Sequence, residues 1–387
     1  MNANFLNDQL IAFQHRPGLT RTIVFANSLG SDQTIWNEVI EKLPGGYGIV
    51  TFDLRGHGQS SVSKDSFCID DLANDAIALI ENLELQQVIF CGVSVGGMIG
   101  QVVASRRPDL VSGAIFCNTS HKIGDKTKWN ERIAAVQAGG VEAISEAAMS
   151  IWFGENFRRV NPNKVLAHEN MLCRTSTGGY IQVCEAIRDA ELKNLCGNIN
   201  LPVLCVGGDE DKSVTPHEVE KLAEIIPNST SQILNGVGHL PPLDAPEKLA
   251  LLIQEFEQSI GYESNVGMST RRSVLGNHHV DKAESSKSDF DAAFQSLITK
   301  SAWETVWSSP MISARERSML TLALLAANGN FEEIPMHIRA TVNTGATEQD
   351  IAEVFQHVAI YSGVPKANHA LKLAKATLAE MKLLKDE

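Results

Sequence analysis

The chain has 387 residues, of which 43% are hydrophobic and 20% charged, so its length predicts two domains of ordinary globular composition. Its formal net charge of −13 argues against nucleic acid or an anionic membrane as the main partner. The sequence has no run of 18 apolar residues, no leader-like amino-terminal segment, and no CxxC spacing among its seven cysteines. We therefore expect a cytoplasmic protein with reduced thiols and no membrane segment.

Short apolar runs alternate with helical patterns from residue 22 to about residue 260. Each run has the length and β-branched content of a buried strand, and the early runs are far enough apart for crossover helices. The alternation predicts a mostly parallel sheet covered by helices within residues 1–262. Residues 121–195 have helical patterning without strand signals, so we expect a helical cap inserted into this domain. The predicted strands are TIVFAN, YGIVTFD, QQVIFCG, VSGAIFCN, LPVLCVGG and TSQILN.

The most specific motif is a G-x-S-x-G sequence around Ser94. It directly follows the predicted strand QQVIFC and directly precedes the helical run GGMIGQVVASRR. A strand, a tight turn and a helix are the context of a nucleophile elbow, in which small glycines permit the strained turn that presents the serine hydroxyl. We predict that Ser94 is a catalytic nucleophile.

A serine nucleophile needs a base and a carboxylate that orients the base. His239 follows the last predicted strand, and the acidic stretch that starts at Asp209 follows the strand before it. We favour Asp211 as the orienting acid, with Asp209 as the alternative. His57 comes too early in the chain for the base, and we expect it to stabilise the loop below the active site. The sequence thus predicts a Ser-His-Asp triad.

Acyl transfer also needs backbone N–H groups where negative charge develops on oxygen. The residue after the nucleophile, Val95, supplies the first candidate. The second should come from a loop after an early strand, and the sequence Asn27-Ser28-Leu29-Gly30 follows TIVFA. We predict that the N–H groups of Leu29 and Val95 form the oxyanion hole.

The segments NSLGSDQTIW, FDLRGHGQS, GVSVGGMIGQ and GVGHLPPLDAPE resemble the 3-oxoadipate enol-lactone hydrolase family, whose fold is the α/β-hydrolase fold. The resemblance covers roughly residues 5–260 and implies hydrolysis of a small anionic lactone. It leaves open whether an acyl-serine forms or water attacks directly. A generalist esterase or lactonase is the alternative. By this resemblance the cap residues that could bind the substrate, an Arg pairing with its carboxylate, are Trp129, Arg132, Trp152 and Arg188.

Residues 263–288 are polar and rich in Gly, Ser and charge, which predicts a linker and lead-in. Residues 289–387 have purely helical patterning with Ser, Thr or Pro starts and Gly ends, so we expect an all-α domain. It has no cysteine, which excludes the thiol redox chemistry of a related alkylhydroperoxidase-like fold. Metal-ligand motifs are also absent from the sequence.

The segments RRSVLG, AWETVW, RSMLTLALLAANG, HIRA, VNTGAT and AIYSGVPKANHA resemble the carboxymuconolactone decarboxylase family. The resemblance implies loss of CO2 from a lactone with two carboxylates, without a metal or organic cofactor. For that reaction His337 is our candidate acid, and Arg317 and His357 are candidate substrate-binding residues. Glu304 and Glu316 depart from the family pattern, so we assign them no role.

The product of the second family is the substrate of the first. The two resemblances together therefore imply a bifunctional enzyme of aromatic catabolism that catalyses consecutive steps. The decarboxylase family forms rings, so we expect a homo-oligomer joined through the carboxy-terminal domain. In the alternative, this domain serves only for oligomerisation.

Overall fold

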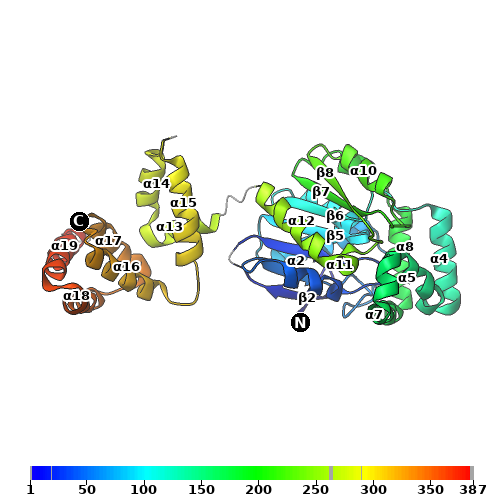
Figure 1. The fold of residues 1–387 in the computed structure, drawn as a ribbon, viewed down its shortest axis with the longest axis horizontal. Coiled ribbons are helices and arrows are strands. Elements are labelled where there is room, and N and C mark those ends of the chain that lie inside the picture. The colour runs from blue at the N-terminus through cyan, green and yellow to red at the C-terminus, as the bar shows by residue number, and fades with distance from the viewer. Residues whose placement is uncertain (1, 19, 261–264, 289, 384–387) are drawn as a thin grey trace. The chain divides into compact units, whose positions relative to one another are not determined.

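The computed structural model describes residues 2–18, 20–260, 265–288 and 290–383. The chain forms two compact units, Met1–Tyr262 and Glu263–Glu387. Each unit has its own hydrophobic core, and each is described separately below (Figure 1).

Unit 1 is built on an eight-stranded sheet with the order β1-β2-β4-β3-β5-β6-β7-β8. β1 pairs with β2 and β2 with β4 in antiparallel fashion, whereas the remaining pairs are parallel. The prediction of a mostly parallel sheet is confirmed. The sequence analysis did not predict β1 and β2, because the edge strand β1 leaves most of its side chains exposed and β2, between β1 and β4, fully buries only Ile11, Ala12 and Phe13. The strands are β1 (Asn2–Leu6), β2 (Gln9–Arg16), β3 (Thr22–Ala26), β4 (Gly48–Phe52), β5 (Val88–Val93), β6 (Val111–Cys117), β7 (Val203–Gly208) and β8 (Ser229–Leu234).

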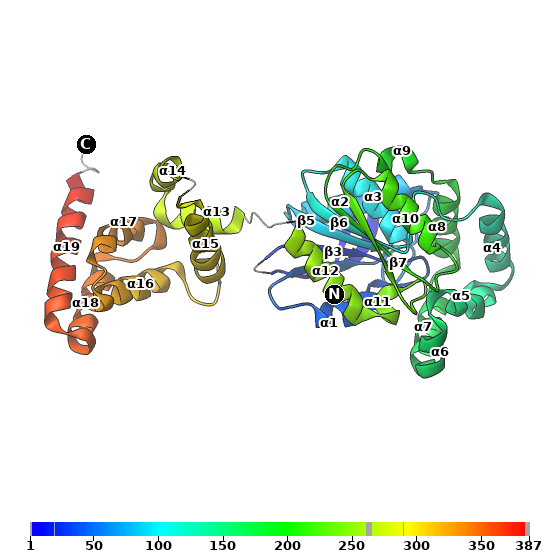
Figure 2. The ribbon, with the colours of Figure 1, turned by 45° about the horizontal axis from the view of Figure 1, so that its top comes forward.

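Helices cover both faces of this sheet. On β6, Gly113 lies against Phe256 of α12, whereas Phe116 lies against Gly100 of α3, so these two helices pack on opposite faces. Figure 2 shows α1 and α12 together on one side of the sheet and α3, α9 and α10 on the other. The helices around the sheet, outside the cap, are α1 (Asn37–Lys42), α2 (Ile69–Asn82), α3 (Val95–Arg106), α9 (Lys193–Cys196), α10 (Pro216–Ile225), α11 (Pro241–Asp244) and α12 (Pro246–Ser259), with the 3-10 turn η1 (Gln33–Trp36).

The segment between β6 and β7 is helical and lies beside the sheet as a cap (Figures 1 and 2). Its longer helices, α4 and α8, pack against each other, and α5 packs against α7. The cap consists of α4 (Lys126–Gly139), η2 (Val141–Ile144), α5 (Ser145–Trp152), α6 (Glu155–Val160), α7 (Pro162–Cys173) and α8 (Thr177–Asp189).

Unit 2 is helical throughout its described residues. The sequence suggested a linker and lead-in over residues 263–288, but the structure has two helices there, α13 (Asn265–Leu275) and α14 (Asn277–Ser285). Helix α13 packs against α17. These helices look polar in sequence because each buries only a few side chains, among them Val274 and Val280. The other helices are α15 (Ala292–Ile298), the π-helix η3 (Thr299–Trp307), α16 (Ala314–Asn328), η4 (Phe331–Glu333), α17 (Ile334–Thr344), α18 (Glu348–Ser362) and α19 (Val364–Leu383).

Within the described ranges, none of the helices combines the length and the apolar character that a membrane crossing requires.

Candidate active site

Ser94 lies at the junction of β5 and α3, in a backbone conformation with φ 57° and ψ −119°. A positive φ is strained for a non-glycine residue. Two glycines make the turn possible, because a Cβ on Gly92 would meet the carbonyl oxygen of Gly96 at 2.2 Å and a Cβ on Gly96 would meet that of Ala26 at 2.3 Å. The turn is also held by a 2.9 Å hydrogen bond from the Ser94 N–H to the Cys117 carbonyl. The local sequence therefore produces the strand, turn and helix that were predicted around this serine.

His239 and Asp211 are in direct contact. Nδ1 of His239 lies 2.8 Å from Oδ2 of Asp211, and both residues are buried. A carboxylate is an acceptor only, so Nδ1 carries the proton and Nε2 is left as the acceptor. Ser94 and His239 both line one small cavity. The arrangement is that of a base which is oriented by a buried carboxylate and faces the same space as the serine.

The carboxylate of Asp211 is held in its charged form by its surroundings. Burial alone raises the pKa of this group, but attraction to His239 and hydrogen bonds from His239, Asn118 and Ser213 outweigh burial and lower the pKa below its ordinary value. Nδ2 of Asn118 donates to Oδ2 of Asp211 at 2.8 Å, and the N–H of Ser213 donates to Oδ1 at 2.7 Å. Sequence reasoning missed Asn118; the available signal was a polar residue directly after the buried strand β6.

Asp209 has a different position. Its Oδ1 accepts hydrogen bonds from the N–H groups of Gly236 at 2.6 Å and Val237 at 3.3 Å. These residues form the turn that leads to His239. The geometry therefore favours Asp211 as the orienting acid and makes Asp209 a support for the histidine loop.

The cavity at Ser94 has an inner and an outer part. The inner part has a volume of about 20 Å³, and a neighbouring outer part has a volume of about 210 Å³. The two share five wall residues, so the outer part leads toward the serine. The shared residues are Ile123, Trp129, Arg132, Ile151 and Ser213.

The cap supplies most of these walls. Trp129 and Arg132 of α4 and Trp152 of α5 line the inner part, as the resemblance implied. The guanidinium of Arg132 lies over the Trp129 ring at 5.5 Å, which keeps a positive charge at the cavity. Arg188 does not line either part; it donates to the carboxylate of Asp189 and to Asn130. The expectation that Arg188 binds the substrate therefore finds no support, because its charge is already paired outside the cavity.

The loop that includes Leu29 is fixed from below by His57. Nε2 of His57 accepts a 2.9 Å hydrogen bond from the Gly30 N–H, and Nδ1 donates to the Arg55 carbonyl at 3.0 Å. Burial lowers the pKa of His57 to about 4 against weaker opposing contacts, so its ring is neutral at pH 7 and can accept. Leu29 lines the inner cavity. Val95 is the first residue of α3, so its N–H has no intrahelical acceptor and is available to a ligand.

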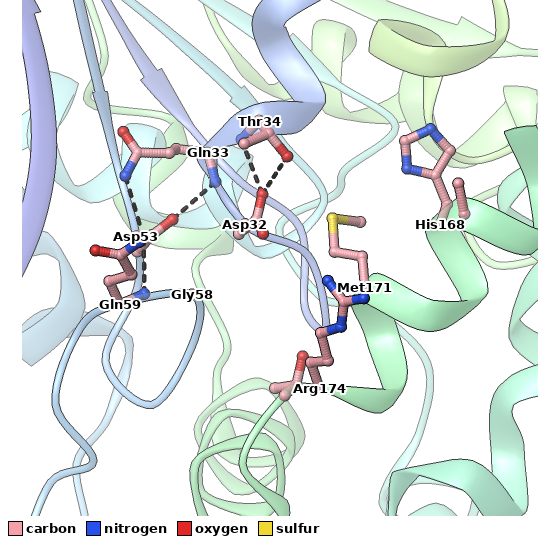
Figure 3. Close-up of a pocket in the computed structure, with 11 residues that line it drawn as sticks. Asp32, Gln33, Thr34, Asp53, Gly58, Gln59, His168, Met171 and Arg174 are labelled. Atoms are coloured by element: carbon pink, nitrogen blue, oxygen red, sulfur yellow. Dashed lines mark hydrogen bonds between the residues drawn. The ribbon is translucent and has the colours of Figure 1, made fainter. Parts of the chain in front are cut away.

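A larger cavity of about 470 Å³ lies elsewhere in unit 1, between α7 and the loops that follow β3 and β4. Figure 3 shows its polar walls, where Asp53 accepts hydrogen bonds from the backbone and amide of Gln33 and from the backbone of Gln59. None of its wall residues lines the cavity at Ser94. Its size alone does not make it the reaction site, because the nucleophile and the base face the smaller cavity.

The candidate residues of unit 2 lie in different surroundings. His337 is buried on α17, and burial followed by the charge of His279 lowers its pKa to about 4. Arg317 of α16 donates to the Ser309 carbonyl at 2.7 Å. His357 is exposed on α18, where its ring lies against Tyr361. The role of His357 in substrate binding stays a prediction, since the single chain leaves this residue exposed.

Glu316 forms the capping box of α16 with Ser313, which is a structural role. In the described part of the chain, no group of three or more His, Cys, Asp or Glu residues could hold a metal ion.

Comparison with known proteins gives one family match in unit 1 and another in unit 2. Residues 21–246 match the family described as alpha/beta hydrolase fold, and residues 292–376 match the Carboxymuconolactone decarboxylase family. Over 225 residues the chain is 33% identical to 3-oxoadipate enol-lactonase 2 of Acinetobacter baylyi, a match that covers 58% of this chain and 84% of that protein.

Two relatives match the carboxy-terminal region over 115 residues, each with 36% identity and 30% of this chain covered. One is 4-carboxymuconolactone decarboxylase of Acinetobacter baylyi, of which 86% is covered. The other is nitrosuccinic acid decarboxylase npaB of Metarhizium robertsii, of which 80% is covered. Both are named as decarboxylases, but of different acids.

Proposed function

Because the chain belongs to the alpha/beta hydrolase fold family in its first unit and to the carboxymuconolactone decarboxylase family in its second, we propose that it is a bifunctional enzyme. Unit 2 decarboxylates 4-carboxymuconolactone to 3-oxoadipate enol-lactone, and unit 1 hydrolyses that lactone to 3-oxoadipate. The observation that supports the hydrolase best is the buried contact of His239 with Asp211 at a cavity that also exposes Ser94.

Hydrolysis uses the triad in its usual roles. Nε2 of His239 removes the proton of Ser94 as the hydroxyl attacks the lactone carbonyl, and Asp211 stabilises the resulting imidazolium. The N–H groups of Leu29 and Val95 stabilise the oxyanion, an effect of about 3 kcal/mol for each donor. The ring oxygen leaves as an enol that takes the proton from His239 and tautomerises to the ketone, and water activated by His239 then hydrolyses the acyl-serine and releases 3-oxoadipate. Direct attack by water is the alternative course of the same step.

The substrate binds in the cap cavity. Trp129 and Trp152 provide flat apolar walls for a five-membered ring, and Arg132 pairs with the carboxylate of the acetate arm. The inner part, about 20 Å³, has room only for the reacting carbonyl, so the ring lies in the outer part of about 210 Å³, a space that suits a small lactone better than a long-chain ester. This size and the single Arg favour an anionic lactone over the substrates of a generalist esterase.

Decarboxylation needs little from the protein beyond binding and a proton. When the bond from the ring carbon to the carboxylate breaks, its electron pair is delocalised through the ring double bond into the lactone carbonyl. Arg317 binds a carboxylate of the substrate, and His337 delivers the proton to the ring. Because the pKa of His337 is about 4 before the substrate binds, this histidine takes up its proton when the dianion is present, since negative charge nearby raises the pKa of a histidine.

We also propose that unit 2 joins copies of the chain into a homo-oligomer. Many of its apolar side chains are exposed in the single chain, and large exposed apolar patches mark association surfaces. Light scattering of the purified protein gives the assembly size. The exposed side chains include Phe290, Phe294 and Leu297 near and on α15, Leu320 and Leu324 on α16, and Ile360 and Tyr361 on α18.

The experiment that tests the function compares the wild type with Ser94→Ala on 4-carboxymuconolactone. CO2 release and the ring signals are followed by NMR in the same sample. We expect the variant to release CO2 at the wild-type rate while the enol-lactone accumulates beyond its spontaneous hydrolysis. If neither protein releases CO2, unit 2 is an assembly domain and unit 1 acts as an esterase or lactonase without it.

A further inference from the structure

Unit 2 buries polar side-chain atoms that have no hydrogen-bond partner among the described residues. They include Nε of Arg271 on α13, Nε of Arg317 and Oγ of Ser318 on α16, and Nδ1 of His337 on α17. Helix α17 packs against both α13 and α16. Folded proteins pair nearly all of their buried polar groups, so each exception needs a reason. A bound polar ligand would supply the missing partners.

Arg271 is the least expected member of this group. It lies in the stretch whose composition suggested a linker, yet it is only 7% exposed. Nη1 donates to Glu284 at 3.2 Å and Nη2 donates to Gln295 at 3.3 Å, which fixes the guanidinium. A guanidinium has five N–H donors, so most of them remain for a ligand.

Positive charge gathers between α13, α14 and α17. Burial lowers the pKa of His279 on α14, and Arg271 lowers it further, together with other basic groups that include Arg339 of α17. His279 in turn lowers the pKa of His337. The arginines here also have carboxylate partners, since Arg271 pairs with Glu284, Arg272 with Asp281 and Arg339 with Glu380. An anion placed here would therefore be bound mainly by the N–H groups of Arg271 that Glu284 and Gln295 do not use, and by His279 once it is protonated.

We propose that Arg271, on the helix that packs against α17, binds the lactone beside His337 and pairs with the carboxylate that the product retains. The inference rests on the proposed function, whose substrate has two carboxylates. It adds to Arg317 a second anion-binding side chain, from α13, which precedes the matched region 292–376 and contains all but the last residue of the segment RRSVLG. The two carboxylates of the substrate thus have two different partners.

The choice of the retained carboxylate follows from the chemistry. An ion pair with the leaving carboxylate stabilises the substrate and is lost as neutral CO2 forms, which raises the barrier. An ion pair with the retained carboxylate stays the same throughout. In the step, the bond from the ring carbon to the leaving carboxylate breaks and CO2 departs. The electron pair reaches the lactone carbonyl through the ring double bond, and His337 gives its proton to the ring carbon beside that carbonyl.

The test uses the full-length protein and the rate of CO2 release from 4-carboxymuconolactone. Arg271→Gln is compared with Arg272→Gln, a matched control, since Arg272 is the next residue and pairs with Asp281. Loss of a charge-assisted hydrogen bond predicts a KM about 10- to 100-fold higher for Arg271→Gln. We expect a smaller change in kcat, partial rescue by Arg271→Lys, and wild-type kinetics for Arg272→Gln.

A purely structural role for Arg271 gives a different result. Glu284→Gln removes the ion pair but keeps the guanidinium, so it should lower the unfolding temperature and leave KM near the wild-type value. If Glu284→Gln and Arg271→Gln change KM equally, Arg271 only supports the fold and the inference is wrong. If Arg271→Gln matches Arg272→Gln while the wild type releases CO2, the inference fails and the proposed function stands. A wild type that releases no CO2 overturns both.

Discussion

The sites of the two units differ in how far their polar groups are satisfied before a ligand binds. In unit 1 both oxygens of Asp211 accept hydrogen bonds, and His239 is oriented by one of them. In unit 2 the buried nitrogens Nε of Arg271, Nε of Arg317 and Nδ1 of His337 lack a partner, whereas at the site of unit 1 the unpartnered atoms include an acceptor, Oδ1 of Asn118. Hydrolysis must stabilise charge that develops on the enzyme and substrate, so its groups are oriented in advance. In the proposed decarboxylation the substrate is a dianion that brings its own electron sink, so the unpaired groups of unit 2 would serve to bind it.

The largest expected effect separates the two acids of unit 1. Asp211→Asn removes the carboxylate that fixes the tautomer of His239, so we expect lactone hydrolysis to fall by about 10³- to 10⁴-fold. Asp209→Asn keeps an oxygen acceptor for the N–H groups of the histidine loop, so the rate of lactone hydrolysis should fall by less than about 10-fold, which corresponds to the weakening of one or two hydrogen bonds. Steady-state hydrolysis of the enol-lactone measures both. Equal losses in the two variants would show that the orienting acid has been misassigned.

The next effect tests whether the units act independently. His337→Gln removes the proton donor of unit 2 and should lower the rate of CO2 release by about 10²- to 10⁴-fold. Hydrolysis of added enol-lactone by unit 1 should remain at the wild-type rate. His217→Gln is the control, because this exposed residue lies on α10 of unit 1 and lines neither part of the cavity at Ser94. A normal rate of CO2 release in His337→Gln would remove this histidine from the mechanism.

A smaller effect concerns substrate binding in the cap. Arg132→Gln removes the positive charge at the cavity and should raise KM for the enol-lactone about 10- to 100-fold, as expected for a lost charged hydrogen bond. Arg188→Gln is matched in chemistry but lies outside both parts of the cavity, so its KM should not change. If instead Arg188→Gln raises KM and Arg132→Gln does not, Arg188 is the residue that binds the substrate carboxylate.

The smallest expected effect is a loss of folding stability at low pH, and it has the same cause in both units. The pKa values of His57 and His337 are each lowered to about 4 in the folded protein. Between pH 6.5 and 4 the unfolded chain therefore binds more protons at these residues, so stability falls as the pH falls. We expect each to remove on the order of 2 kcal/mol from the unfolding free energy of its unit between pH 7 and pH 5.

Urea unfolding at the two pH values measures this loss. His57→Gln and His337→Gln should each reduce the pH dependence of one unit and leave the other unit unchanged. A protein that becomes more stable between pH 7 and pH 5 would contradict the buried neutral state of both histidines.

The sequence by itself determined the features that depend on local geometry and chain order. The glycines around Ser94 predict the elbow because no larger residue fits the turn, and the position of His239 after the last strand brings it to the carboxyl edge of the sheet. The Carboxymuconolactone decarboxylase match and the α/β hydrolase match agree with the fold that these patterns predicted.

Only the tertiary structure decided between residues of equal chemistry. Asp209 and Asp211 are two positions apart, and their roles differ because β6 supplies Asn118 beside only one of them. Arg132 and Arg188 differ because one helix directs its charge into the cavity while the other pairs it with Asp189. Arg271 is buried where α13 packs against other helices, and its guanidinium donates to Glu284 of α14 and Gln295 of α15. Such contacts depend on long-range packing, which the composition of a single segment does not contain.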